Sequence, residues 1–198
     1  MKDTRSKIIK VATKVMNQKG YHGTSTEMIA KKAGIAKSTI FHHFKNKEDI
    51  LHVILEQTVP GAIFNLTLIV HDRNLTPRVK LKAFLKFHMK LVEEYGNVLD
   101  LYFEGSRFLR KQNRQIYIER RRVYTTLVRQ ITREMQQETP HRFSNLNPTI
   151  VANTILGMCN WTYTWYKKDG KLDMSAIADQ FYQIIAGNTG PEEIQVRA

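Results

Sequence analysis

The chain carries, between Gly23 and Phe44, the stretch GTSTEMIAKKAGIAKSTIFHHF. Its helical periodicity predicts two short helices, at about 26–33 and 37–44, separated by a tight turn at Gly34. The residues expected to pack inward are small or apolar: Ile29, Ala30, Ala33, Ile35, Ile40 and Phe44. Small residues allow two helices to cross closely, and a glycine permits the turn between them. The stretch therefore predicts a helix-turn-helix.

The outward face of the second of these helices carries hydrogen-bond donors rather than the alternating Glu and Lys of an ordinary solvated surface. Lysine donates to guanine edges, hydroxyls contact bases or phosphates, and a helix N-terminus directs N–H groups at the DNA backbone. Flanking residues would fix the register through phosphates. The predicted DNA-contacting residues are Thr24, Thr26, Lys37, Ser38, Thr39, Phe41, His42, His43 and Lys47. The alternative is a helical hairpin that does not bind DNA.

Over residues 5–55 the sequence resembles the TetR family of one-component regulators, through the stretch quoted above and the following FKNKEDIL of residues 44–51. The resemblance implies an N-terminal three-helix DNA-binding domain, a helical ligand-binding and dimerisation domain, and release from a DNA operator when a small molecule binds. Two positions depart from the family pattern. Ala36 stands where Ser often caps the recognition helix, and Phe41 stands where the family often has Tyr.

Helical periodicity dominates the rest of the chain, and no alternating strand pattern persists. Capping residues, prolines and glycines predict helices at about 4–19, 26–33, 37–44, 47–58, 76–96, 113–137, 147–169 and 173–186. Gly20 is expected to stop the first helix in a left-handed conformation, Asn46 to cap the fourth, and Thr139-Pro140 to close the long basic one. We expect an all-α fold of about nine helices, with a DNA-binding domain at 1–50 and a ligand-binding and dimerisation domain at 51–198.

The net charge of +13 is concentrated in two blocks. Residues 1–50 hold 11 basic and 4 acidic side chains, and residues 107–133 hold 9 basic and 1 acidic. Such concentration favours polyanionic partners, and the first block fits double-stranded DNA. The second block is rich in arginine, which binds phosphate through two parallel hydrogen bonds. It predicts either a phosphate-bearing ligand or plain surface charge.

The single cysteine, Cys159, cannot form a disulfide within the chain, which favours a reducing, cytoplasmic location. The first 20 residues are charged throughout and do not resemble a secretory signal. The most apolar stretch, Ile63–Val70, is short and contains Asn65 and Thr67, so we expect no transmembrane span and no membrane partner.

Aromatic and apolar residues recur at helical spacing between residues 60 and 190. Such stripes are usually plain core, but the family resemblance implies that some line a ligand cavity, which is mostly apolar with a few polar groups. His88 would either orient a ligand or be a core histidine with satisfied hydrogen bonds. The candidate ligand-binding residues are Phe84, Phe87, His88, Leu91, Phe103, Arg107, Arg110, Tyr124, Trp161 and Trp165.

Residues 157–170, GMCNWTYTWYKKDG, resemble the corresponding run of TetR-type regulators of fatty acid breakdown, which respond to acyl-CoA thioesters. An acyl-CoA joins an apolar chain to a polyphosphate head, so it would use the apolar stripes and the second basic block together. The alternative is a hydrophobic inducer without a CoA group, as in multidrug and other lipophilic sensors.

The last two predicted helices have the composition of an interface. Their apolar residues are Ile150, Val151, Ile155, Met158, Cys159, Ile177, Phe181, Ile184 and Ile185, with Thr154 and Gly157 among them. In the family that the chain resembles, these helices pair with their copies in a four-helix bundle. The resemblance therefore implies a homodimer, whose twofold symmetry matches a palindromic operator.

An enzyme is not expected. The chain has no glycine-rich phosphate loop, no HExxH motif and no nucleophile elbow, and the adjacent His42-His43 lacks the spacing of metal ligands on a helix. We expect no catalytic residue, no metal and no cofactor. A protein that binds nucleic acid without sequence preference, by charge alone, remains the other alternative to a repressor.

Overall fold

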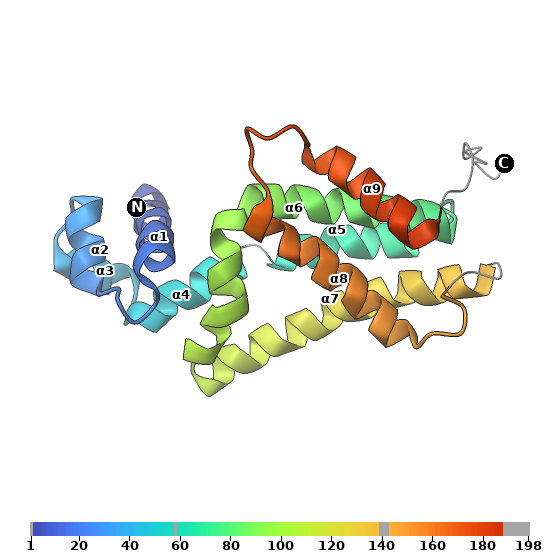
Figure 1. The fold of residues 1–198 in the computed structure, drawn as a ribbon. Coiled ribbons are helices and arrows are strands. Elements are labelled where there is room, and N and C mark those ends of the chain that lie inside the picture. The colour runs from blue at the N-terminus through green and yellow to red at the C-terminus, as the bar shows by residue number, and fades with distance from the viewer. Residues whose placement is uncertain (1, 58, 139–142, 188–198) are drawn as a thin grey trace. The chain divides into compact units, whose positions relative to one another are not determined.

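The computed structural model describes residues 2–57, 59–138 and 143–187, and all regular structure within them is helical (Figure 1). Its elements are α1 (Lys2–Lys19), α2 (Thr26–Ala33), α3 (Lys37–His43), α4 (Lys47–Glu56), α5 (Val59–His71), α6 (Pro77–Gly105), the 3₁₀ turn η1 (Ser106–Phe108), α7 (Lys111–Glu138), α8 (Pro148–Trp165) and α9 (Met174–Ala186). The expected all-α fold of about nine helices is confirmed. Thr139-Pro140 and residues 188–198 lie outside the described residues.

The helices form two units. The first unit consists of Met1–Gly61 with Tyr95–Arg120, and the second of Ala62–Glu94 with Arg121–Ala198. Because α6 and α7 are long, each contributes residues to both units. The predicted domains, 1–50 and 51–198, stay a prediction, since compactness does not show which residues bind DNA or a ligand.

Local sequence signals set the helix ends of the first unit. Gly20 and Gly34 have φ values of 71° and 63°, in the left-handed region that glycine favours. Asn46 caps α4 by accepting a hydrogen bond from the backbone N of Asp49 at 3.0 Å, as expected. Ala36 gives α3 no side-chain cap, which the departure from the family pattern implied.

The core of the first unit includes the end of α6 and the start of α7. Its buried members are Ile8, Ile9, Ala12, Met16, Ile29, Ala30, Ile40, Phe44, Ile50, Leu51, Ile54, Leu55, Leu101, Leu109 and Tyr117. The predicted helix end at Gly96 is therefore wrong, because α6 continues to Gly105. A glycine inside a helix costs only about 1 kcal/mol relative to alanine, and burying a leucine such as Leu101 contributes more.

The second unit contains α8 and α9, most of α5 and parts of α6 and α7. Its buried core residues include Leu66, Leu81, Phe84, Leu85, Met89, Val128, Ile131, Ile155, Cys159, Ile177 and Ile185. The expected start of α8 is confirmed, because Asn147 accepts a hydrogen bond from the backbone N of Thr149 at 2.9 Å and Pro148 follows directly.

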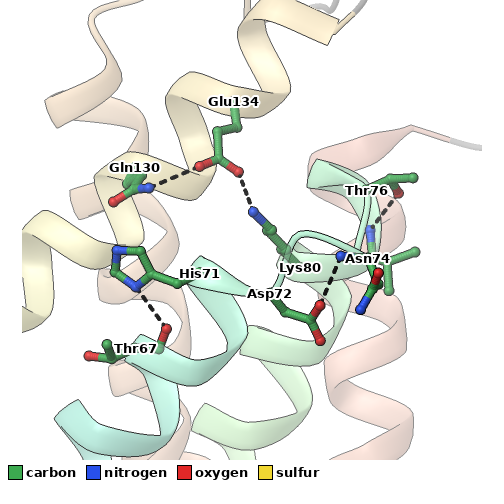
Figure 2. A network of polar contacts seen from close by, with 9 residues as sticks. Thr67, His71, Asp72, Asn74, Thr76, Lys80, Gln130 and Glu134 are labelled. Atoms are coloured by element: carbon green, nitrogen blue, oxygen red, sulfur yellow. Dashed lines mark hydrogen bonds and ion pairs between the residues drawn. The ribbon is translucent and has the colours of Figure 1, made fainter. Parts of the chain in front are cut away.

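Polar contacts join α6 to α7 within this unit (Figure 2). Lys80 Nζ donates to Glu134 Oε2 at 2.8 Å, and Gln130 Nε2 donates to Oε1 of the same carboxylate at 3.0 Å. The Lys80 side chain is only 10% exposed, so it needs this partner to offset the loss of water. The pair therefore fixes the first turn of α6 beside the last turns of α7.

The stretch Lys47–His71 has the length and composition of a membrane-crossing helix, although the sequence predicted no span. It comprises α4 and α5, and Ile50, Leu51 and Ile54 within it are buried in the core of the first unit. Core helices of soluble proteins pass the same test of length and composition. The stretch is therefore only a weak indication of a membrane span.

Candidate DNA-binding surface and ligand-binding unit

Helix α3 presents a face rich in donors to solvent. Lys37, Ser38 and His42 are exposed, and Phe41 has 48% of its surface accessible. Ile40, on the other side of the helix, is fully buried and anchors it to the core. The remaining predicted contacts of α3 are half-buried: Thr39 and His43. With no acidic residue in its first turn, this face suits the acceptor-rich major groove of DNA.

The two threonines expected at phosphates differ in their surroundings. Thr24 is 2% exposed, and its hydroxyl donates to the carbonyl oxygen of Gly20 at 2.8 Å. Thr26, in the first turn of α2, is half-buried. The Thr24 hydroxyl would have to exchange this internal hydrogen bond to reach a phosphate, so its DNA contact stays a prediction.

Lys47, expected at a DNA phosphate, is engaged inside the first unit. Its Nζ donates to the carbonyl oxygens of Tyr21 and Thr24, both at 2.7 Å, and lies 4.2 Å from the centroid of the Tyr21 ring. Burial lowers the pKa of the Lys47 ammonium from its usual value. Lys47 thus ties the start of α4 to the loop between α1 and α2. Its phosphate contact stays a prediction.

His88 lies at the centre of a polar bridge between three helices of the second unit. Its Nδ1 is 2.8 Å from the hydroxyl of Tyr124 on α7, and its Nε2 is 3.0 Å from Oδ1 of Asn160 on α8. An amide oxygen only accepts, so Nε2 carries the proton and Nδ1 accepts from Tyr124. Burial lowers the pKa of His88 to about 4, although the hydrogen bond to Asn160 opposes this shift. His88 is therefore a neutral, fully hydrogen-bonded group.

The structure brings together only part of the predicted ligand-binding set. The Phe84 ring centroid lies 5.5 Å from that of His88 and 6.5 Å from that of Tyr124, so these three form one cluster, in which Phe84 and His88 are buried and Tyr124 is half-buried. Two further candidates in the second unit, Phe87 and Leu91, are half-buried. The other three belong to the first unit: Phe103, Arg107 and Arg110. Trp161 and Trp165 are 66% and 46% exposed and lie outside the cluster. Asn160 was missed, because a single polar residue in an apolar run does not show which face it occupies.

Several residues of the basic block from Arg107 to Arg133 make contacts inside the protein. Arg107 pairs with Glu104 at 2.9 Å, and Arg110 Nε lies 2.8 Å from Glu48 Oε2. Arg120 pairs with Glu56, and Arg129 donates to the Thr149 hydroxyl at 3.5 Å. Exposure does not follow this pairing, because Arg107 and Arg110 are exposed as well as Lys111, Arg114, Arg121, Arg122 and Arg133. Several arginines therefore already have partners inside the protein.

Helix α8 has one face that the second unit leaves exposed. Its members recur every three or four residues, as neighbours on a helix do: Ile150, Thr154, Gly157, Trp161 and Trp165. Ile150 is 65% exposed, and Ile184 on α9 is 59% exposed. Val151, Ile155 and Cys159, which the sequence grouped with them, are instead buried in the unit's own core. The predicted interface composition thus mixes two faces of α8.

Two family models match the chain. The model described as "Bacterial regulatory proteins, tetR family" matches residues 8–54, and the model described as "Tetracyclin repressor-like, C-terminal domain" matches residues 74–188. The chain belongs to the TetR family. It is accordingly a DNA-binding transcriptional regulator and not an enzyme, as the sequence predicted.

Individual relatives are similar over nearly the whole chain. The "Fatty acid metabolism regulator protein" of Bacillus subtilis (strain 168) is 28% identical over 189 residues, 93% of this chain and 96% of that protein. The crystal structure of AibR in complex with isovaleryl coenzyme A and operator DNA is 25% identical, covers 92% of this chain and 98% of that one, and has a TM-score of 0.80. A TetR-family regulator from Bordetella parapertussis 12822, 23% identical over 94% of this chain and 96% of its own, has a TM-score of 0.84 and supports the fold alone.

Proposed function

We propose that this TetR-family regulator is a cytoplasmic repressor that binds a palindromic operator as a homodimer and leaves it when a small hydrophobic ligand binds. The observation that carries the proposal is the exposed donor face of α3, anchored from behind by the buried Ile40. A twofold dimer would present two such faces to successive major grooves, about one helical turn of DNA apart. Sequence-specific binding then follows from contacts with base edges.

The DNA-binding part is tested with the duplex that the wild-type protein enriches most strongly from a random-sequence library. Lys37→Ala should weaken binding to this duplex by about 1–3 kcal/mol and bind random DNA nearly as before, because a base contact carries sequence information. Lys45→Ala, which removes an exposed charge beside α3, should weaken both alike. Equal weakening of both DNAs by Lys37→Ala would mean that α3 does not read the bases.

A long-chain acyl-CoA is the ligand that we propose first. The similar Bacillus subtilis protein is named a fatty acid metabolism regulator, and the similar AibR was crystallised with isovaleryl coenzyme A. In the second unit, the apolar surface of the cluster around Phe84 has the chemistry to contact an acyl chain, and the exposed Arg121 and Arg122 have the chemistry to bind the phosphates of a CoA head.

Two observations favour the second candidate, a hydrophobic ligand without a CoA group. Arg110 and Arg120 of the basic block already pair with Glu48 and Glu56, and the polar group at the centre of the second unit, His88, is neutral. A ligand that bound only the cluster of Phe84, His88 and Tyr124 would need one group to hydrogen-bond with the polar residues there, and it would need no phosphate.

Release of the protein from the enriched duplex distinguishes the two candidates. We expect palmitoyl-CoA to release it and palmitate to be far weaker, because each charge-assisted hydrogen bond to phosphate contributes about 1.5–3 kcal/mol. Replacing both Arg121 and Arg122 with Ala should raise the palmitoyl-CoA concentration needed by about tenfold or more and leave operator affinity nearly unchanged. Equal potency of acid and thioester would favour the ligand without CoA, and release by neither would exclude the lipid assignment.

A further inference from the structure

The segment from Gly105 to Arg120, here called the α4 clamp, packs along α4 within the first unit. One of its contacts is with Glu48, whose side chain is only 7% exposed. Glu48 Oε1 accepts hydrogen bonds from the backbone N of Arg110 at 3.1 Å and from Nδ2 of Asn113 at 2.8 Å, and Oε2 forms an ion pair with Arg110 Nε at 2.8 Å. A buried carboxylate needs such partners, since an unpaired buried charge is costly.

A second ion pair joins the other end of α4 to the α4 clamp, where Arg120 Nη1 contacts Glu56 Oε2. Between the two pairs, Leu51 packs against Gly105, with its Cδ1 3.4 Å from where a β-carbon of that glycine would stand. Leu51 and Gly105 are both buried. The clamp therefore holds α4 at both ends and in the middle.

The α4 clamp also contacts the loop that leads into α2. The ring of Phe108 stacks on that of Tyr21, with centroids 4.8 Å apart and planes 10° apart. Lys47 lies over the same Tyr21 ring and donates to the carbonyl oxygens of Tyr21 and Thr24. Thr24 directly precedes Ser25, whose hydroxyl caps α2. Contacts thus run without interruption from Phe108 to the start of the helix-turn-helix.

We infer that the α4 clamp positions the helix-turn-helix for DNA binding, and that Arg110 and Phe108 are positioning residues of the DNA-binding unit rather than ligand contacts. Arg110 acts through Glu48 in the first turn of α4, and Phe108 acts through Tyr21 before α2. The clamp thereby fixes α4 and the loop before α2, and α2 in turn packs on α3. The inference rests on the proposed function only in that the chain binds an operator.

The test compares Arg110→Gln with Arg114→Gln in the full-length protein, on the duplex that the wild-type protein enriches from a random library. Arg114 is exposed and lies one helical turn beyond Arg110, so it is a matched control for charge. Arg110→Gln should weaken operator binding roughly tenfold, and Arg114→Gln should change it by no more than about twofold. Equal effects of the two variants would overturn the inference.

Salt dependence separates positioning from direct contact with DNA. Because Arg110 acts through Glu48, Arg110→Gln should leave the slope of log Kd against log salt concentration unchanged. A residue that neutralises a phosphate would instead lower that slope by about one. A lowered slope would therefore identify Arg110 as a phosphate contact and overturn the positioning role.

A double variant tests whether Arg110 acts through Glu48. Arg110→Gln should weaken binding no further when Glu48→Gln is already present, because both variants break the same pair. Should Glu48→Gln fail to fold, Asn113→Ala removes one hydrogen bond to the same carboxylate and should give a smaller loss in the same direction.

Hydrogen exchange needs no DNA, so it tests the clamp even if the proposed function fails. In Arg110→Gln the amides of residues 21–25 should exchange faster than in the wild-type protein, and in Arg114→Gln they should not. Unchanged exchange would overturn the inference. A wild-type protein that enriched no duplex would contradict the proposed function instead.

Discussion

His88 is a buried base that its surroundings hold neutral, and this predicts a dependence of stability on pH. Its pKa falls from 6.5 to about 4 on folding, so between these values the unfolded chain binds more protons than the folded one. The free energy of unfolding should therefore fall as the pH falls from about 7 to about 5, with His88 contributing about 2 kcal/mol of the loss. Above about pH 7 the contribution is constant.

Urea unfolding followed by circular dichroism at both pH values measures this loss. His88→Gln, compared with the wild-type protein at equal concentration, should lose about 2 kcal/mol less over the same pH interval, since it keeps a polar group but cannot titrate. Parallel losses in both proteins would show that folding does not lower the pKa of His88.

Single residues differ in how far sequence alone predicts them. Gly34 and Asn46 were predicted correctly, because a turn or a cap depends on neighbours a few residues away. The contact of His88 with Asn160 joins residues 72 positions apart, and that of Glu48 with Arg110 joins residues 62 apart. Such pairs depend on how helices pack. The concentration of arginines between residues 107 and 133 was visible in the sequence, but it could not show which of them form ion pairs with glutamates of α4.

At the scale of helices, α6 shows that a glycine alone does not end a helix. Gly20 and Gly34 follow their helices with positive φ, whereas Gly96 lies inside α6. What extends α6 is the burial of residues beyond Gly96, including Leu101, in the core of the first unit. This burial is in a core shared with residues of α4, such as Leu51, which lie about 50 positions earlier in the chain. Helical periodicity cannot predict packing between segments so far apart in the sequence.

The position of Gly96 predicts a stabilising substitution. A β-carbon placed there would meet no atom within 4 Å, so Gly96→Ala should raise the free energy of unfolding by about 0.5–1 kcal/mol, by restricting the unfolded chain and favouring the helix. Gly34 also has open space, but its φ of 63° disfavours any side chain. Gly34→Ala should therefore lower stability by about 1 kcal/mol or more. Thermal unfolding of both variants checks the contrast, and a destabilised Gly96→Ala would mean that α6 is bent or broken at that residue.

At the scale of the whole molecule, the proposed dimer depends on which face of α8 is free. Periodicity identified the apolar residues of α8 and α9 but could not divide them between the unit's core and its surface. Ile155 is 3% exposed and Ile150 is 65% exposed, although the sequence placed both in one interface. A charge at Ile155 would therefore disturb the fold, and only the exposed stripe can test the dimer.

Trp161 lies at 66% exposure in the middle of that stripe, next to Gly157, where helices can approach closely. Trp161→Glu should leave the thermal stability of the protomer nearly unchanged and place a charge in the proposed interface, so sedimentation velocity should show monomers where the wild-type protein forms dimers. Operator affinity should fall toward that for random DNA, a loss on the order of a thousandfold, because one half-site offers too few contacts.

Phe64→Glu is the matched control, since Phe64 is 64% exposed on α5 of the same unit, and it should remain dimeric and bind the operator. Dimers that survive Trp161→Glu but dissociate in Phe64→Glu would move the interface to α5, and a wild-type monomer that still selected a palindrome would remove the dimer from the mechanism.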